Sequence, residues 1–411
     1  MKIIILFLII PLFAFPQETL LRWNGELRIR TEADGRDFNL KTAPNLYTLS
    51  RIRLGAEIQP VQNVSITLIM QDSRRFGEEP TTTTNNKNLD LYEGYAKLDS
   101  FLLPQLSVKA GRFAISCGSD RILGRLNWNN IGRAFDGLLV HYGVNDGLLD
   151  LFAVNISDVN TLPDPVNVTN TAFKRDEGTM MLGGYYIQPF GKELTVNIYA
   201  LEERNKNTLT LGNPNLLRTT SGIHLKGTIE ELIYETDAAY QFGSVNGTTI
   251  SAWMAAFSIG QTITGSPVTS VSLNTDIISG TDPSSTEVNT FVPPYATGHK
   301  FYGMMDYFIN FQVQTYNRGL MDIYLRGSFV PLENTVTTVS LHHFVTQKKF
   351  SANESLQDFG QELDILTQFK YNRSVSFDWG ISAFVPGKIM RGAFFANDVS
   401  YWSYLSALVV F

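Results

Sequence analysis

Arginine side chains recur at every second position in two N-terminal segments of the chain. Arg28 and Arg30 are separated by one apolar residue, and so are Arg51 and Arg53. In a β-strand, residues two apart point to the same face. A guanidinium group is permanently charged, and its planar fork matches a carboxylate. The spacing therefore predicts a row of weak anion-binding groups that speeds the passage of an anion without trapping it. The alternative is that these arginines only pair with carboxylates of the same wall.

Two longer stretches concentrate further polar side chains. Residues 111–137 place four arginines and a carboxylate among glycines: Arg112, Arg121, Arg125, Arg133 and Asp136. Residues 294–308 combine aromatic side chains with His299, Lys300 and Asp306. The second stretch lies in segment 280–318. Structureless loops longer than about 15 residues are usually functional or disordered, and this one is too aromatic for a disordered segment. The sequence is compatible with a loop inside or outside a lumen.

The side chains that usually carry catalysis or bind metals form no recognisable motif. The five histidines include no H-E-x-x-H spacing, and the chain contains neither a phosphate-binding glycine loop nor a G-x-S-x-G elbow. The single cysteine, Cys117, allows no intrachain disulfide and no cysteine-based zinc site. We therefore expect no catalytic residue, no metal site and no cofactor.

The elements that position these residues are predicted to be β-strands, because apolar and polar residues alternate from residue 24 to the end. The segments are 24–34, 46–58, 62–72, 89–98, 105–114, 134–143, 147–156, 178–188, 193–203, 218–227, 231–242, 249–259, 267–279, 319–329, 335–345, 360–370, 374–385 and 400–411. The count is 18, and bacterial outer-membrane barrels have an even number of strands. The predicted fold is all-β, a transmembrane antiparallel barrel.

The lengths of the connections support a barrel. Links after even-numbered strands are mostly short, such as 143–147, whereas links after odd-numbered strands are mostly long, such as 113–133. Short periplasmic turns and long outer loops are typical of outer-membrane barrels. The short link 242–248 and the longer turn 98–105 depart mildly from this pattern.

The last strand and the lipid environment fix which way the side chains point. Leu405, Ala407, Val409 and Phe411 share one face of a strand that ends the chain on an aromatic residue. We expect this strand to close against the first and to be recognised by the barrel-assembly machinery. An arginine facing lipid at mid-membrane costs about 2–4 kcal/mol. That penalty predicts that the arginines of the first two strands point inward, while the apolar face contacts lipid and lipopolysaccharide.

The ends and the bulk composition complete the assignment. Lys2, the apolar run 3–13 and Ala14 resemble a secretory signal peptide, so we expect residues 1–16 to be a signal peptide and 17–411 a single barrel. No later apolar run approaches 18 residues, which argues against a transmembrane helix. The formal net charge of −6 argues against nucleic acid as a partner.

At the two polar stretches the chain resembles the alginate-export-domain family of outer-membrane porins. The first carries a Gly-Arg strand end, D-R-x-x-G, a tryptophan and then G-R-x-F-D-G, and the second reads Y-x-x-x-H-K-F-x-G-x-M-D-Y-F. Shared features continue at 319–322 and 360–364. The resemblance implies an 18-stranded monomeric barrel with an arginine-rich lumen that conducts an anionic polymer.

The resemblance also implies roles for single residues. Those that would line or guard the pore and guide the solute are Arg28, Arg30, Arg51, Arg53, Arg112, Arg121, Arg125, Arg133, Asp136, His299, Lys300 and Asp306. Carboxylates are expected on the same lumenal face at Glu57, Asp136, Asp364 and Asp378, which argues against a purely anion-selective pore.

Three functions are compatible with such a barrel. The first is passive diffusion or export of a small or polymeric solute, anionic or sugar-like. The second is a structural or adhesive barrel with a plugged lumen. The third is an enzyme in a barrel wall, for which no residue spacing provides support.

Overall fold

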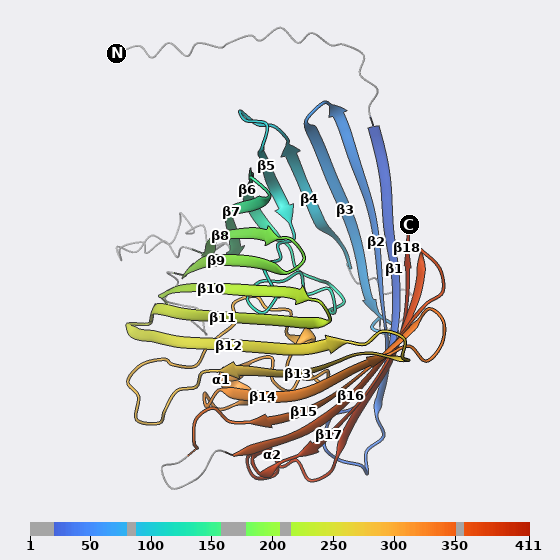
Figure 1. Ribbon diagram of the computed structural model, residues 1–411, viewed down its shortest axis with the longest axis vertical. Coiled ribbons are helices and arrows are strands. Elements are labelled where there is room, and N and C mark those ends of the chain that lie inside the picture. The colour runs from blue at the N-terminus through green and yellow to red at the C-terminus, as the bar shows by residue number, and fades with distance from the viewer. Residues whose placement is uncertain (1–19, 80–87, 158–177, 206–214, 351–356) are drawn as a thin grey trace, which may run out of the picture.

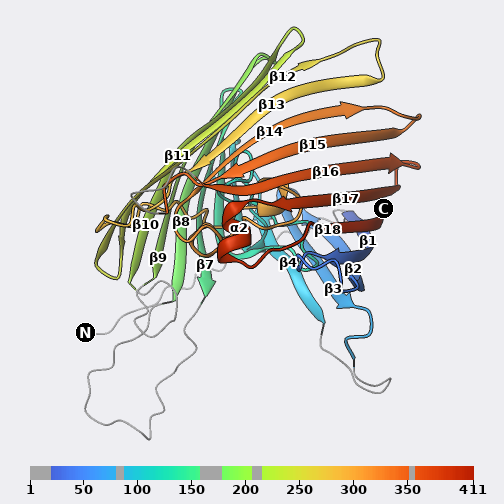
Figure 2. The same cartoon turned by 90° about the horizontal axis from the view of Figure 1, so that it is seen from below.

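The computed structural model describes residues 20–79, 88–157, 178–205, 215–350 and 357–411. Within these residues one antiparallel sheet of 18 strands contains every strand. Each strand pairs with its neighbours in sequence, and β1 (Leu20–Gly35) also pairs with β18 (Ser400–Val410), which closes the sheet into a barrel (Figures 1 and 2). The expected signal peptide, 1–16, lies outside the described residues.

The intervening strands follow the predicted order, and their ends differ from the predicted ones by a few residues. They are β2 (Asn45–Val61), β3 (Val64–Arg75), β4 (Leu89–Leu98), β5 (Leu106–Phe113), β6 (Phe135–Val144), β7 (Gly147–Ser157), β8 (Thr179–Phe190), β9 (Leu194–Asn205), β10 (Leu216–Ile229), β11 (Leu232–Val245), β12 (Thr248–Thr262), β13 (Val268–Ile278), β14 (Leu320–Phe329), β15 (Thr335–Val345), β16 (Asp358–Lys370) and β17 (Val375–Pro386). The prediction of an 18-stranded antiparallel barrel is confirmed.

The closing seam depends on the last residue of the chain. The backbone N–H of Gly25 donates to the carbonyl of Phe411 at 3.0 Å, and the N–H of Phe411 donates back to Gly25 at 3.1 Å. A Cβ atom at Gly25 would collide with the Phe411 ring. Glycine is therefore required where the C-terminal aromatic side chain crosses the first strand.

The two faces of the wall differ as the alternation predicts. On β2 the side chains of Ile52 and Leu54 are exposed on the outer face, whereas those of Arg51 and Arg53 are buried on the inner face. Apolar side chains dominate the outer positions of the other strands as well. The outer surface is therefore suited to hydrocarbon.

Among the residues that the structure describes, no helix is both long and apolar enough to cross a membrane.

A charge placed on this outer face is expected to destabilise the barrel. Leu54 lies near the middle of β2 and is 50% exposed, so Leu54→Arg is expected to lower the free energy of unfolding by about 2–4 kcal/mol. The control is Leu332→Arg in the turn between β14 and β15, where the side chain is 72% exposed and the cost falls to about 0–1 kcal/mol. Urea unfolding in phospholipid vesicles measures both. Equal stability of the two variants would contradict lipid contact at Leu54.

Two of the long loops fold into the barrel and form its core. We call 114–134, between β5 and β6, the first inner loop, and 279–319, between β13 and β14, the second inner loop. The second contains the 3₁₀ turn η1 (Gly298–Lys300) and helix α1 (Phe311–Gln314). A short bridge joins the two loops, because the N–H of Tyr295 donates to the carbonyl of Ile122 at 2.9 Å. The buried aromatic side chains of the second inner loop pack on aromatic side chains of the wall.

The remaining helix, α2 (Lys388–Ala393), lies in the loop between β17 and β18. Most long loops lie at one rim and the short turns at the other, as predicted from the sequence. The exception expected between β11 and β12 is present as a tight turn at 246–247.

Candidate functional site

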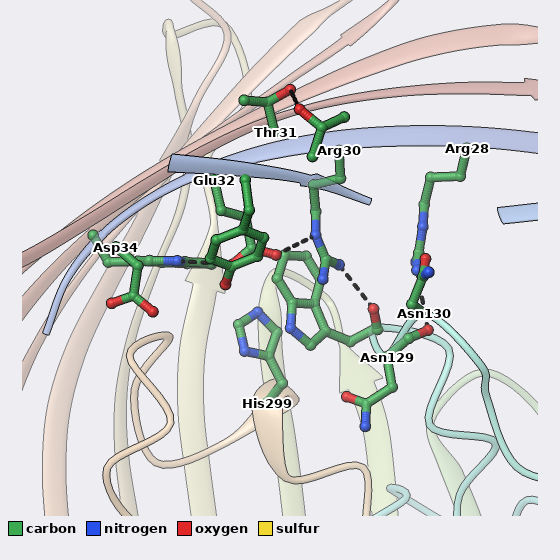
Figure 3. Close-up of polar contacts among 12 residues, drawn as sticks. Arg28, Arg30, Thr31, Glu32, Asp34, Asn129, Asn130 and His299 are labelled. Carbon is green, nitrogen blue, oxygen red and sulfur yellow. Dashed lines mark hydrogen bonds and ion pairs between the residues drawn. The ribbon is translucent and has the colours of Figure 1, made fainter. Parts of the chain in front are cut away.

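The inward-pointing arginines of β1 bind the backbone of the first inner loop (Figure 3). Arg28 donates from Nη1 to the carbonyl of Asn127 at 2.7 Å and from Nη2 to that of Asn129 at 3.0 Å. Arg30 donates from Nη1 to the carbonyl of Trp128 at 2.8 Å. Arg28 and Arg30, which are two residues apart on the inner face of β1, therefore bind three consecutive carbonyl groups of the loop.

The arginines of β2 extend this contact. Arg51 donates to two carbonyls of the same loop segment at 3.0 Å each and pairs with Glu26 at 2.5 Å. Arg53 donates from Nε to Oε1 of Gln71 at 2.7 Å and from Nη2 to the carbonyl of Ile131 at 3.1 Å. The arginines therefore hold the first inner loop in place, as well as facing the inside of the barrel.

The charges in this row do not cancel. Arg30 pairs with Glu32 at 2.8 Å, and Glu26 lies beside Arg51 and, at 3.9 Å, Arg53. Four guanidinium groups therefore face two carboxylates. A carbonyl accepts a hydrogen bond without neutralising the charge, so the row keeps a positive excess.

Trp128 lies between two planar groups, inside the wall formed by β1 and β18. The Cζ atom of Arg30 is 3.7 Å from the centroid of the Trp128 ring, and the ring of His299 stacks on it at 3.8 Å and 9°. Two groups this close to one centroid must lie on opposite faces of the indole. Because His299 belongs to the second inner loop, this stack joins the two inner loops.

Two aromatic side chains of β18 complete the group, which we call the aromatic cluster: Trp128, His299, Trp402 and Tyr404. The ring centroids of Trp402 and Tyr404 lie 5.8 and 4.8 Å from that of Trp128. Asp306 orients the imidazole, since its carboxylate oxygens lie 3.0 Å from Nδ1 of His299.

A cavity lies on each side of the aromatic cluster, and Trp128 lines both. The upper cavity, of about 490 Å³, is bordered by Arg30, Glu32 and Asp306. The lower cavity, of about 550 Å³, is bordered by polar wall residues that include Arg326. β1 runs toward the rim with the long loops, and Arg30 and Glu32 lie late in that strand, so the upper cavity faces this rim. β14 runs away from the same rim, and Arg326 lies late in β14, so the lower cavity faces the short turns.

Carboxylates of β16 anchor the second inner loop. The N–H of Met304 donates to Oδ2 of Asp364 at 3.1 Å, and the N–H of Met305 donates to Oε1 of Glu362 at 2.9 Å. Gly303 lies directly against Glu362 with a φ of +83°, where a Cβ atom would come within 2.6 Å of the carboxylate. This loop can approach the wall so closely only because residue 303 has no side chain.

Comparison with known proteins agrees with this architecture. The model of the alginate export family matches residues 20–398. The chain belongs to the alginate export family. No match is found among curated proteins.

Solved structures of outer-membrane channels share the fold of this alginate export family member. Acinetobacter baumannii OccAB4 superposes with a TM-score of 0.61 at 10% identity, covering 97% of this chain and 100% of that chain. Pseudomonas aeruginosa OccK8 (OprE) gives 0.60 at 13% identity, with 95% and 98% covered. P. aeruginosa OpdK with vanillate gives 0.59 at 10% identity, again with 95% and 98% covered. A closed barrel of this family with an apolar outer face lies in the bacterial outer membrane.

Three further predicted residues of this family member support the inner loops. Arg121 pairs with Asp276 of β13 at 2.7 Å, and its Cζ lies 3.9 Å from the ring centroid of Phe301. Arg133 donates to the carbonyls of Gly124 and Tyr295. Lys300 behaves similarly, because its Nζ donates to the carbonyl of Ser119 at 2.9 Å. These cations fasten the two loops together.

Arg112 and Asp136 lie elsewhere, which corrects the expectation that they line the pore. They pair with each other at 2.8 Å, and the side chain of Asp136 is 63% exposed. The residue after Arg112, Phe113, is fully buried on the inner face beside Tyr95, so the alternation directs Arg112 outward. Both residues lie at the end of their strands next to the long loops, where an outward charge costs about 0–1 kcal/mol.

Other candidate chemistry is limited in the part of the chain that the structure describes. No group of three or more His, Cys, Asp or Glu side chains there could hold a metal ion. Burial raises the pKa of the Cys117 thiol, which keeps it protonated and poorly nucleophilic.

Sequence reasoning missed the part that β18 and β16 play. Trp402 and Tyr404 both point inward. They are two residues apart on the face of β18 opposite Leu405, and this alternation was the signal that could have predicted their direction. Nothing in the local sequence of Glu362 indicates that it binds a loop about 57 residues away.

Proposed function

We propose that this barrel is a passive channel for small solutes that carry a carboxylate group. The observation that carries the proposal is the division of the lumen by the aromatic cluster, with a cavity above and a cavity below and a positive excess at the wall beside it. A solute would cross from one cavity to the other by displacing side chains of this cluster.

The preference for anions follows from the charges of the arginine row. Arg28 has no carboxylate partner among the described residues, and its Nε is buried without a hydrogen bond. Uncompensated charge in a narrow, low-dielectric passage raises the local concentration of the opposite ion. Because each guanidinium group is already held by loop carbonyls, an anion would be attracted without being bound tightly.

The preference for small solutes with a planar or ring-shaped part follows from the aromatic cluster. Trp128 and Tyr404 line the lower cavity and present ring faces and edges to a passing molecule. Vanillate, bound to the structurally similar OpdK, is an aromatic carboxylate. The polymer in the family's name would require the two inner loops to separate at Trp128 and His299, so a small solute is the better fit.

The assignment to anions is tested by removing two charges of the row. Arg51→Gln with Arg53→Gln keeps one amide donor at each position and is expected to lower the chloride-to-potassium permeability ratio at least about twofold. The ratio is obtained from zero-current potentials in planar bilayers under a KCl gradient.

The matched control removes the same number of charges outside the lumen. We call Lys192→Gln with Arg373→Gln, both in exposed short turns, the rim control. It is expected to leave the ratio unchanged. An unchanged ratio in the Arg51/Arg53 variant, or an equal fall in the rim control, would contradict a selective role for the row.

The second candidate is a closed structural barrel. The van der Waals contact between Trp128 and His299 favours it, because the two inner loops touch each other inside the barrel. Conductance separates the two, since a closed barrel remains silent in a bilayer. In either case we propose that the barrel-assembly machinery recognises the strand ending at Phe411.

A further inference from the structure

A third cavity lies at the short-turn end of the lumen, under the first inner loop. Its volume is about 290 Å³, and its lining includes Lys97, Lys109, Arg125 and His141. Lys97 and Lys109 belong to β4 and β5 near the turn that joins them, whereas Arg125 comes from the first inner loop. Cations from the wall and from the loop therefore converge on one small space, which we call the cationic cavity.

Two of these side chains already have a carboxylate partner. Nζ of Lys97 lies 2.7 Å from a carboxylate oxygen of Asp99. Nδ1 of His141 lies 2.5 Å from a carboxylate oxygen of Asp150, the one carboxylate in the lining. The other two cations of the lining are Lys109 and Arg125.

Lys109 and Arg125 have no ion pair within 4.0 Å among the described residues. Nζ of Lys109 lies 4.3 Å from the ring centroid of Tyr95, which positions the ammonium group without neutralising it. Glu93 of β4 acts on both cations, and Asp150 acts on Lys109, in each case from beyond ion-pair distance. Neither Lys109 nor Arg125 therefore has an anionic group at ion-pair distance among the described residues, and both cations can accept an anionic ligand in the cavity.

We infer that the cationic cavity binds a compact oxyanion with two negative charges, of the phosphate or dicarboxylate class. An ammonium group from the wall and a guanidinium group from the first inner loop, both lining one small space, favour a ligand that carries charge at two points. A volume of about 290 Å³ is at the lower end of the range for small-molecule pockets, which excludes a polymer segment. The inference rests on the proposed function only for the route by which the anion arrives.

Binding is measured without any need for conduction. Inorganic phosphate at pH 8, where it is a dianion, is titrated against the full barrel in detergent micelles, and the dissociation constant is taken from the ³¹P line width. Lys109→Gln with Arg125→Gln is expected to weaken binding at least about tenfold, since two charge-assisted contacts are lost. The rim control is expected to bind as the wild type does. Equal binding by the wild type and the Lys109/Arg125 variant would overturn the inference.

A variant with the opposite sign guards against loss of folding. Glu93→Gln removes the competing carboxylate and is expected to tighten phosphate binding severalfold, whereas weaker or unchanged binding would count against the site. Succinate and acetate, each used to displace phosphate, identify the ligand class. Displacement by succinate but not by acetate at the same concentration indicates a dicarboxylate site, and displacement by neither indicates phosphate. Equal displacement by acetate would overturn the requirement for two charges.

The outcomes also distinguish this site from the proposed channel. A barrel that is silent in bilayers but binds phosphate through Lys109 and Arg125 would refute the channel and keep the site. An anion-selective channel whose phosphate binding is unaffected by the Lys109/Arg125 variant would refute the site and keep the channel.

Discussion

Trp128→Ala is expected to raise the single-channel conductance severalfold. The indole separates the upper and lower cavities and is held between Arg30 and His299, so its removal joins the two spaces. It also removes the stack that joins the two inner loops, a contact for which the cation–π part alone is worth about 0.5–2 kcal/mol. Conductance of the purified protein in planar bilayers measures the effect.

The control is the same substitution on the lipid-facing side. Trp253 of β12 is exposed between two buried inward neighbours, so Trp253→Ala changes the wall without touching the lumen. Its conductance is expected to match that of the wild type, and His299→Ala is expected to lie between the two. An unaltered conductance in the Trp128→Ala variant would place the narrowest point elsewhere.

Glu362→Ala with Asp364→Ala is expected to release the second inner loop from the wall. Each carboxyl group accepts a backbone N–H of that loop, and a hydrogen bond of this kind contributes about 0.5–1.5 kcal/mol. Lys300 lies in the same loop inside the barrel, where trypsin cannot reach it. Cleavage after Lys300 in folded, micelle-bound protein, mapped by mass spectrometry, is the expected result.

Asp378→Asn provides the comparison for this variant. Asp378 also lines the lower cavity, but it accepts a hydrogen bond from Gln368 of the wall and not from the loop. The Asp378→Asn protein is expected to resist trypsin as the wild type does. Protection of Lys300 in the Glu362/Asp364 variant would show that other contacts hold the loop.

The strands and the direction of the first four arginines could be predicted from the sequence. Alternation is a local property, and the cost of a lipid-facing arginine depends only on the face it occupies. The contacts that hold the inner loops are not local. Arg28 and Asn127 are 99 residues apart, and Arg36 and Met305 are 269 apart. The position of segment 280–318 inside the lumen therefore could not be predicted, because it depends on hydrogen bonds between residues that are far apart in the sequence.

Two smaller differences between the predicted and the observed site concern Arg112 and the lumenal arginines. Arg112 and Arg28 are both strand arginines, yet Arg112 lies beside the inward Phe113 at a rim, where an outward charge is tolerated. The lumenal arginines were expected to face a solute directly. In the structure they bind carbonyl groups of the first inner loop, because an inward guanidinium group needs several hydrogen-bond acceptors and the folded loop supplies them.

The central claim is that small anions pass between the two inner loops, and the zero-current potential of the wild-type protein tests it most directly. With a KCl gradient across a planar bilayer, the account predicts discrete open channels whose zero-current potential shifts toward the chloride equilibrium potential. A barrel that folds and inserts but remains silent, or one whose potential shifts toward that of potassium, would contradict it.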